Sequence, residues 1–152
     1  AIALARLLGD TLHALILSEA NLDAGGGFFS RQIAAYSEQA YLHTGHQALV
    51  AQNIADGNSL WAASLAQSSP LAIYRNAQSL IAGQTPNWRA TLYDLPVAKG
   101  FLFGSLSLPD PDVDALAAHG VPVVIIPEVG HSMAWENPAA VAAAIHQLIP
   151  VA

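Results

Sequence analysis

The spacing of apolar and polar residues near the start of the chain indicates a helix followed by a strand. Residues 1–8 form a largely apolar helical segment, and Gly9 and Asp10 mark its end. A short apolar strand follows within residues 12–23. Its residues 14–17 are continuously apolar, which is typical of a strand covered on both faces.

The middle of the chain, from about residue 30 to residue 95, has no strand pattern. Its apolar positions instead recur at helical spacing, and Gly, Asn, Ser and Pro residues divide the helical segments from one another. The expected segments are residues 30–43, 46–57, 59–68, 70–83 and 86–95.

Strands and helices alternate again in the last third. We expect strands at 99–106 and 121–127, each followed by a helix, at 112–119 and 138–148. Gly120 stands where a glycine commonly ends a helix. Strands that alternate with helices favour an α/β fold with a parallel sheet, and the middle segment is then an insertion over one end of that sheet.

Composition narrows the classes of partner. Apolar residues make up 53% of the 152 positions and charged residues only 11%, against about 25% in an average protein, which favours a partner surface or helices on both sides of a sheet. The net charge of −6, with five scattered cationic residues, argues against nucleic acid. There is no cysteine, no apolar run of about 18 residues and no signal-peptide pattern, so we expect a cytoplasmic protein without a membrane partner.

His131 is the strongest candidate for chemistry. It follows the predicted strand 121–127, and loops after the carboxyl ends of parallel strands are where such sheets place their sites. Imidazole is the side chain best suited to take and return a proton near neutral pH.

Three stretches resemble the α/β-hydrolase family, in the order that the family has them. IIPEVGHSMAWENPAAVAAAI resembles its last strand, histidine loop and final helix. LAIYRNAQSLIAGQTPNWRATLYDLPVAKGFLFGS resembles the end of its helical cap and its penultimate strand, and AIALARLLGDTLHALILSEANLD resembles the helix after the nucleophile and the next strand. The resemblance implies the C-terminal part of a parallel α/β-hydrolase sheet with an inserted helical cap: residues 1–24 and 97–152 as core, and 25–96 as cap.

The family places its nucleophile in a G-x-S-x-G turn just before the first of these helices. No such turn occurs in this sequence. The resemblance therefore implies that the nucleophile and the first strands lie on a missing N-terminal segment, and that the complementary N-terminal half of the same hydrolase is a partner.

The resemblance also implies an acid that orients His131. Most members carry it after the penultimate strand, but Gly104–Ser107 contains no carboxylate. Asp110 and Asp112 come later, and Asp110 before Pro111 has the pattern of a helix N-cap. Some members, including a group of haloalkane dehalogenases, carry the acid at the end of the earlier strand, where this chain has Glu19 in SEAN. Glu19 is the preferred acid, with Asp110 and Asp112 as alternatives.

The expected function is hydrolysis of a small apolar ester or a related acyl substrate without a cofactor. Phe28, Met133 and Trp135, next to the expected site loops, are the candidate substrate-binding residues. Two alternatives stay open: a haloalkane dehalogenase or epoxide hydrolase with an Asp nucleophile, and a non-catalytic ligand-binding protein on the same fold.

Two motifs that imitate metal sites are set aside. His43 and His46 have the spacing of two ligands, but no third ligand follows nearby. The segment 110–114, DPDVD, imitates the start of a calcium loop, but Ala115 and Val121 replace its glycine and closing glutamate. We expect no metal.

Overall fold

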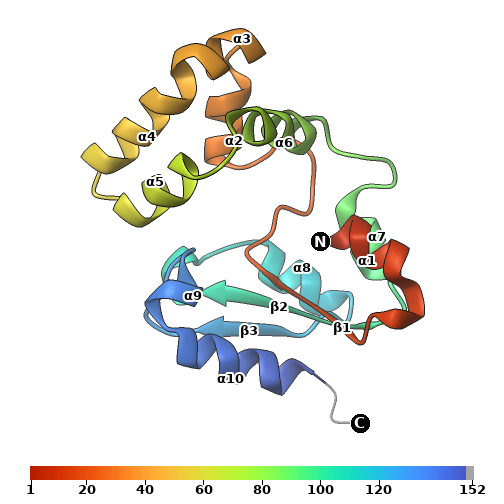
Figure 1. Cartoon of the computed structure of the whole chain (residues 1–152). Helices are drawn as coiled ribbons and strands as arrows, with labels where there is room; N and C mark the ends of the chain where they lie inside the picture. The colour runs from red at the N-terminus through yellow and green to blue at the C-terminus, as the bar shows by residue number, and fades with distance from the viewer. Residues whose placement is uncertain (150–152) are drawn as a thin grey trace. The chain divides into compact units, whose positions relative to one another are not determined.

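The computed structural model describes residues 1–149, which form two compact units (Figure 1). The first consists of Ala1–Ala20 together with the chain from Trp88 onward, and the second is Asn21–Asn87. These boundaries fall somewhat before the expected ones at residues 24 and 96. The assignment of the units as core and cap stays a prediction.

The first unit contains a three-stranded parallel sheet, so the expected α/β architecture with a parallel sheet is confirmed. Its strands are β1 (Ala14–Ser18), β2 (Ala98–Gly104) and β3 (Val123–Ile126), in the spatial order β1-β2-β3. Leu17 is opposite Phe101 and Phe103 is opposite Ile125. All three strands therefore end at the same edge of the sheet.

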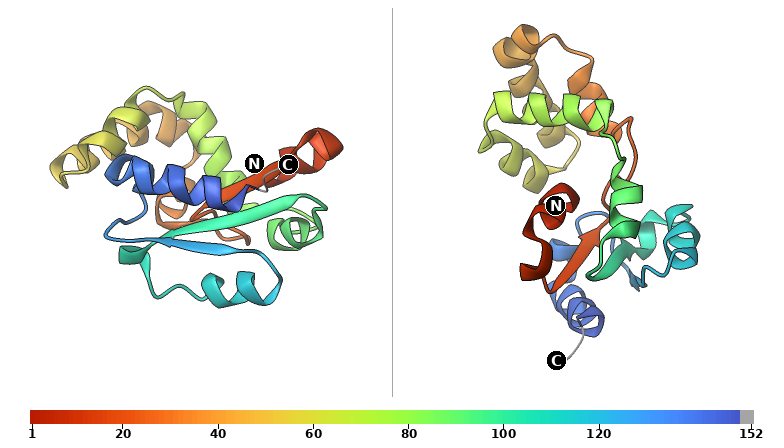
Figure 2. Two further views of the ribbon diagram at one scale, coloured as in Figure 1. Left: turned by 90° about the horizontal axis from the view of Figure 1, so that it is seen from below. Right: turned by 90° about the vertical axis from the view of Figure 1, so that its right-hand side faces the viewer.

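Helices cover the two faces of this sheet. Figure 2 shows α8 (Asp112–Ala118) on one face and α10 (Pro138–Leu148) on the other. The Asn137 side chain caps α10 by accepting a hydrogen bond from Ala140 N–H at 3.0 Å. The other helical elements of this unit are short: α1 (Ile2–Leu8), η1 (Gly9–Thr11), α7 (Trp88–Asp94), η3 (Ser105–Ser107) and α9 (Met133–Glu136).

One core cluster of the first unit lies between the sheet and α10. Its buried members come from β2, β3, the loop after β3, α9 and α10: Leu102, Ile126, Val129, Met133 and Ala144. Only β2 is buried along most of its length. Buried and half-buried residues alternate in β1, so the expected cover on both faces of that strand is only partial. In β3, Ile125 is exposed.

The second unit is helical throughout its regular structure. Its elements are α2 (Phe28–Ala34), α3 (Glu38–Ala40), the π-helix η2 (Tyr41–Gly45), α4 (His46–Ala55), α5 (Ser59–Ala66) and α6 (Pro70–Ala82). Ile33, Tyr41, Tyr74 and Ala77 form its buried core. The helix α6 begins as its Ser-Pro pattern predicts, with Ser69 accepting a hydrogen bond from Ala72 N–H.

Several predicted elements differ in extent from the observed ones, and two of the differences concern how the chain turns. The strand expected over 99–106 ends at Gly104, because Ser105–Ser107 turns into a 3₁₀-helix. The helix expected over 30–43 is split, and its second part continues through the π-helix into α4. Within residues 1–149, no helix has both the length and the apolar character needed to cross a membrane.

Candidate functional site

His131 lies in the loop between β3 and α9, at the edge of the sheet where the strands end. Two buried residues hold this loop on the core: Val129 is 2% exposed and Met133 is 1% exposed. The His131 side chain between them is 73% exposed. The loop is therefore anchored by packing on both sides, and its imidazole is presented outward.

Glu19 directly follows β1 at the same edge. Its backbone N–H donates to Leu102 O at 3.0 Å, which continues the β1–β2 pairing by one residue. Its φ of 38° lies in the left-handed region, which is uncommon for a residue other than glycine. Such a conformation costs of order 1–3 kcal/mol and persists only where the surrounding structure enforces it. Residues of this kind are found most often at functional sites.

The structure brings Glu19 and His131 into direct contact across 112 positions of sequence. Glu19 Oε2 lies 2.8 Å from His131 Nδ1, and Glu19 Oε1 accepts a hydrogen bond from Gly104 N–H at 2.8 Å. The Glu19 side chain is only 11% exposed. One carboxylate oxygen is thus tied to the end of β2, and the other faces the imidazole.

These contacts set the charge of Glu19. Burial by itself would raise the pKa of this carboxyl, but hydrogen bonds from Gly104, His131 and Ser107 outweigh burial and lower the pKa below its ordinary value. Glu19 is therefore ionised at neutral pH and can only accept hydrogen bonds.

The ionised carboxylate fixes the imidazole tautomer. Because Glu19 Oε2 can only accept, His131 Nδ1 must carry the proton of the bond between them. In the neutral ring the lone pair is then on Nε2. The pair can therefore accept a proton at Nε2 and stabilise the imidazolium that results.

The loop that carries His131 is held by further hydrogen bonds. Gly130 N–H donates to Glu136 Oε2 at 2.6 Å, and Glu128 N–H donates to Ser105 Oγ at 2.8 Å. A Cβ built on Gly104 would overlap the carbonyl oxygens of Val129 and Gly130. The loop therefore packs directly on the end of β2, and only glycine fits at position 104.

The three candidate substrate-binding residues have different surroundings. Met133 is buried, and its Sδ accepts a hydrogen bond from Ser18 Oγ at 3.3 Å. Trp135, on α9, is 71% exposed. Phe28 begins α2 of the second unit and is 64% exposed. Trp135 and Phe28 present apolar surface, whereas Met133 supports the loop from inside.

The two alternative acids make other contacts. Asp110 Oδ1 accepts a hydrogen bond from Asp112 N–H at 2.8 Å, but the N-cap of α8 is Pro111, one residue later than the sequence predicts. Asp112 forms a 2.7 Å ion pair with Arg89 of α7. Glu19 is thus the carboxylate of the three that contacts His131.

The His43–His46 motif also has a structural setting. His46 is 7% exposed, and its Nδ1 lies 3.0 Å from the hydroxyl of the fully buried Tyr41. Among residues 1–149, no three His, Asp or Glu side chains are placed to hold a metal ion.

Comparison of the chain with models of known protein families found no match, and comparison with curated proteins found none.

Sequence reasoning missed Gly104 and Glu136 as parts of this site. Gly104 contributes a backbone N–H, which has no signature of its own in a sequence. Glu136 contributes a side chain to the backbone of Gly130, six positions earlier. The available signal was its place one turn after the histidine loop, where a carboxylate can reach back to unpaired N–H groups.

Proposed function

We propose that this chain is the C-terminal part of an α/β-fold hydrolase with an inserted helical cap, and that His131 is its general base and Glu19 the acid that orients it. One observation carries the proposal: an ionised, anchored carboxylate holds the Nδ1 proton of an outward-facing histidine. The sequence resemblance supports the same assignment. The proposed substrate is a small, largely apolar ester or a related acyl compound.

In this mechanism the nucleophile is a serine on a segment outside these 152 residues, since no G-x-S-x-G turn occurs within them. His131 Nε2 takes the hydroxyl proton as the serine oxygen attacks the carbonyl carbon. The imidazolium then gives that proton to the leaving alkoxide, which departs as the alcohol. His131 then removes a proton from a water molecule, which attacks the acyl-enzyme. The carboxylic acid is released, and the serine hydroxyl is regenerated.

The surface of the first unit supports a complementary segment as partner. Among the described residues, β1 pairs with β2 alone, so its other edge is unpaired. Leu4, Leu7 and Leu8 of α1 are also exposed, at 57%, 83% and 43%. Unpaired strand edges and clustered apolar side chains are the surfaces that a further strand and its helix would cover.

A second candidate is a haloalkane dehalogenase or epoxide hydrolase. The observation that favours it is the position of the acid after β1 rather than after β2. The nucleophile would then be an Asp, and His131 would activate the water that hydrolyses the ester intermediate. An ester and a haloalkane, supplied as separate substrates, distinguish the two reactions.

The test begins with the intact mass of the purified protein under native conditions, which shows whether a nucleophile-bearing segment accompanies the 15.8 kDa chain. Turnover of p-nitrophenyl butyrate is then measured for that assembly and for its His131→Ala and Glu19→Gln variants. We expect losses on the order of 10⁴-fold in each. His146→Ala, at an exposed position of α10, is the control. Retained turnover in His131→Ala would exclude the base assignment, and an assembly inactive on all substrates would favour a ligand-binding protein.

A further inference from the structure

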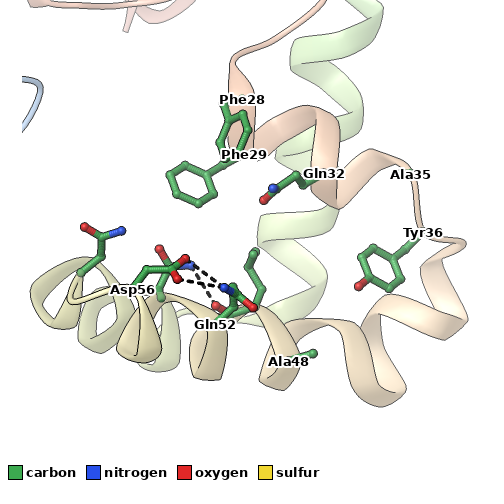
Figure 3. A pocket seen from close by; sticks show the side chains of 11 residues that line it. Phe28, Phe29, Gln32, Ala35, Tyr36, Ala48, Gln52 and Asp56 are labelled. Atoms are coloured by element: carbon green, nitrogen blue, oxygen red, sulfur yellow. Dashed lines mark hydrogen bonds between the residues drawn. The ribbon is translucent and has the colours of Figure 1, made fainter.

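The second unit contains a cavity of about 700 Å³, within the size range of small-molecule sites. Its lining residues come from two stretches, 28–36 and 48–58. They belong to α2 and the residues after it, and to α4 and the turn before α5 (Figure 3). The whole cavity therefore lies within one compact unit.

Aromatic rings form one wall. Phe28 and Phe29 pack edge to face with their ring centroids 5.4 Å apart, and Phe29 stacks on Trp61 at 3.9 Å. Tyr36, also lining the cavity, is 40% exposed, and Phe28 is 64% exposed. Phe29 is thus held in place by its stacking on Trp61. Phe28, which also lines the cavity, leaves much of its surface exposed.

The opposite wall, at α4, carries the polar pair Gln52 and Asp56 beside Ala48 (Figure 3). Gln52 Nε2 donates to both carboxylate oxygens of Asp56, at 3.0 Å each, across one turn of α4. This contact orients the carboxylate and leaves several of its acceptor positions open. Among the described residues that line the cavity, Asp56 is the one with a charged side chain.

We propose that this cavity binds a small organic ammonium ion whose apolar body lies on Phe28 and Phe29 and whose cationic end faces Asp56. A carboxylate attracts an ammonium group directly, and aromatic faces attract cations through their negative quadrupole. The described residues that line the cavity include no lysine, arginine or histidine to favour an anion. The inference does not depend on the Glu19–His131 pair, which belongs to the other unit.

The exposure of Asp56 limits the expected selectivity. Asp56 and Gln52 are both exposed, so water and salt screen the attraction between the carboxylate and a cation. We expect a phenethylammonium ion to bind several-fold more tightly than 2-phenylethanol, its neutral counterpart, near 0.1 M salt. The matched anion, 3-phenylpropionate, should bind more weakly than either.

The experiment titrates the full chain with these three compounds by isothermal titration calorimetry, near 0.1 M and near 1 M salt. The Debye length, over which charges are screened, is about 10 Å at the lower concentration and about 3 Å at the higher. Asp56→Asn keeps the shape of the side chain and removes its charge, so it should reduce binding of the ammonium ion to that of the alcohol. Asp10→Asn, an exposed carboxylate in the other unit, is the charge-matched control and should change nothing. Phe28→Ala should weaken the binding of the ammonium ion and of the alcohol to the same extent, because both place their apolar body on that ring.

High salt provides a test without any substitution, because it should remove the preference for the cation in the unmodified chain. Equal binding of all three compounds at low salt would overturn the proposal. So would an Asp56→Asn variant that keeps the preference, or the absence of heat for every compound up to its solubility limit.

Discussion

The backbone N–H of Gly104 donates to Glu19 Oε1 at 2.8 Å, so the end of β2 holds the side chain that follows β1. The carboxylate cannot turn away from His131 without giving up this bond, and its burial leaves little water to replace it. The pairing of Glu19 with His131 is therefore a property of the sheet edge rather than of two flexible side chains.

The tautomer of His131 gives a first prediction. Long-range ¹H–¹⁵N spectra at pH 8 should show His131 with its proton on Nδ1, because ionised Glu19 accepts from that atom. Glu19→Gln should reduce this tautomer, since an amide group can also donate to an unprotonated Nδ1. His146 is an internal control whose spectrum should not change. A His131 with its proton on Nε2 in the unmodified chain would contradict the geometry.

The depressed pKa of Glu19 predicts a pH dependence of stability. Because the pKa is lower in the folded chain than in the unfolded one, ionised Glu19 stabilises the fold above the unfolded value of about 4.3. That contribution is lost as the pH falls through the folded pKa. Glu19→Gln should cost about 2 kcal/mol at pH 7 through its charged hydrogen bonds. The difference should shrink below pH 4, as measured by urea unfolding across pH 3–7.

Gly104→Ala should displace the histidine loop. The new Cβ would overlap the carbonyl oxygens of Val129 and Gly130, so the loop must move away from β2. We expect a cost of about 1–3 kcal/mol in urea unfolding, together with a changed His131 environment by NMR. Gly27→Ala is the control, because its Cβ would meet only ordinary contacts with Asn21, at 3.6 Å and 3.7 Å. Equal costs for the two variants would contradict the close packing at Gly104.

Glu136→Gln should weaken the hydrogen bond that holds the backbone of Gly130, the residue before His131. Its carboxylate accepts from Gly130 N–H at 2.6 Å, and a neutral amide oxygen makes a weaker bond. Hydrogen exchange at the Gly130 amide should become several-fold faster. Glu128→Gln is the control, because Glu128 joins the loop network through its backbone N–H rather than its side chain. An unchanged exchange rate in Glu136→Gln would show that the contact does not protect this amide.

Much of the α/β pattern could be predicted because each element carries a local signal. Asn137 and Pro138 mark the start of α10, and its predicted range of 138–148 is the observed one. The end of β2 could not be predicted, because residues 105 and 106 continue its pattern while Gly104 is closed in by the histidine loop. That closure depends on residues 25 positions later, which no local pattern reports.

The candidate site was predictable where strand ends determine it. Glu19 and His131 each follow a strand of the parallel sheet, so their meeting at one edge follows from the topology. The π-helix at Tyr41–Gly45 was not predictable in this way. Its first residue, Tyr41, makes a buried contact with His46, and two histidines with metal-ligand spacing give no indication of that contact.

The left-handed backbone at Glu19 makes position 19 a site where a mutational scan should rank residues differently under two selections. In a screen for folded chains alone, glycine and asparagine accept this backbone more easily but lose the Glu19 contacts with Gly104 and His131, which also stabilise the fold. A screen for the carboxylate–imidazole pair rewards glutamate. Aspartate relieves the backbone but is one methylene shorter, so it serves neither screen fully. Glutamate should therefore rank first in the second screen, and its rank against glycine in the first shows how far its hydrogen bonds offset the backbone strain.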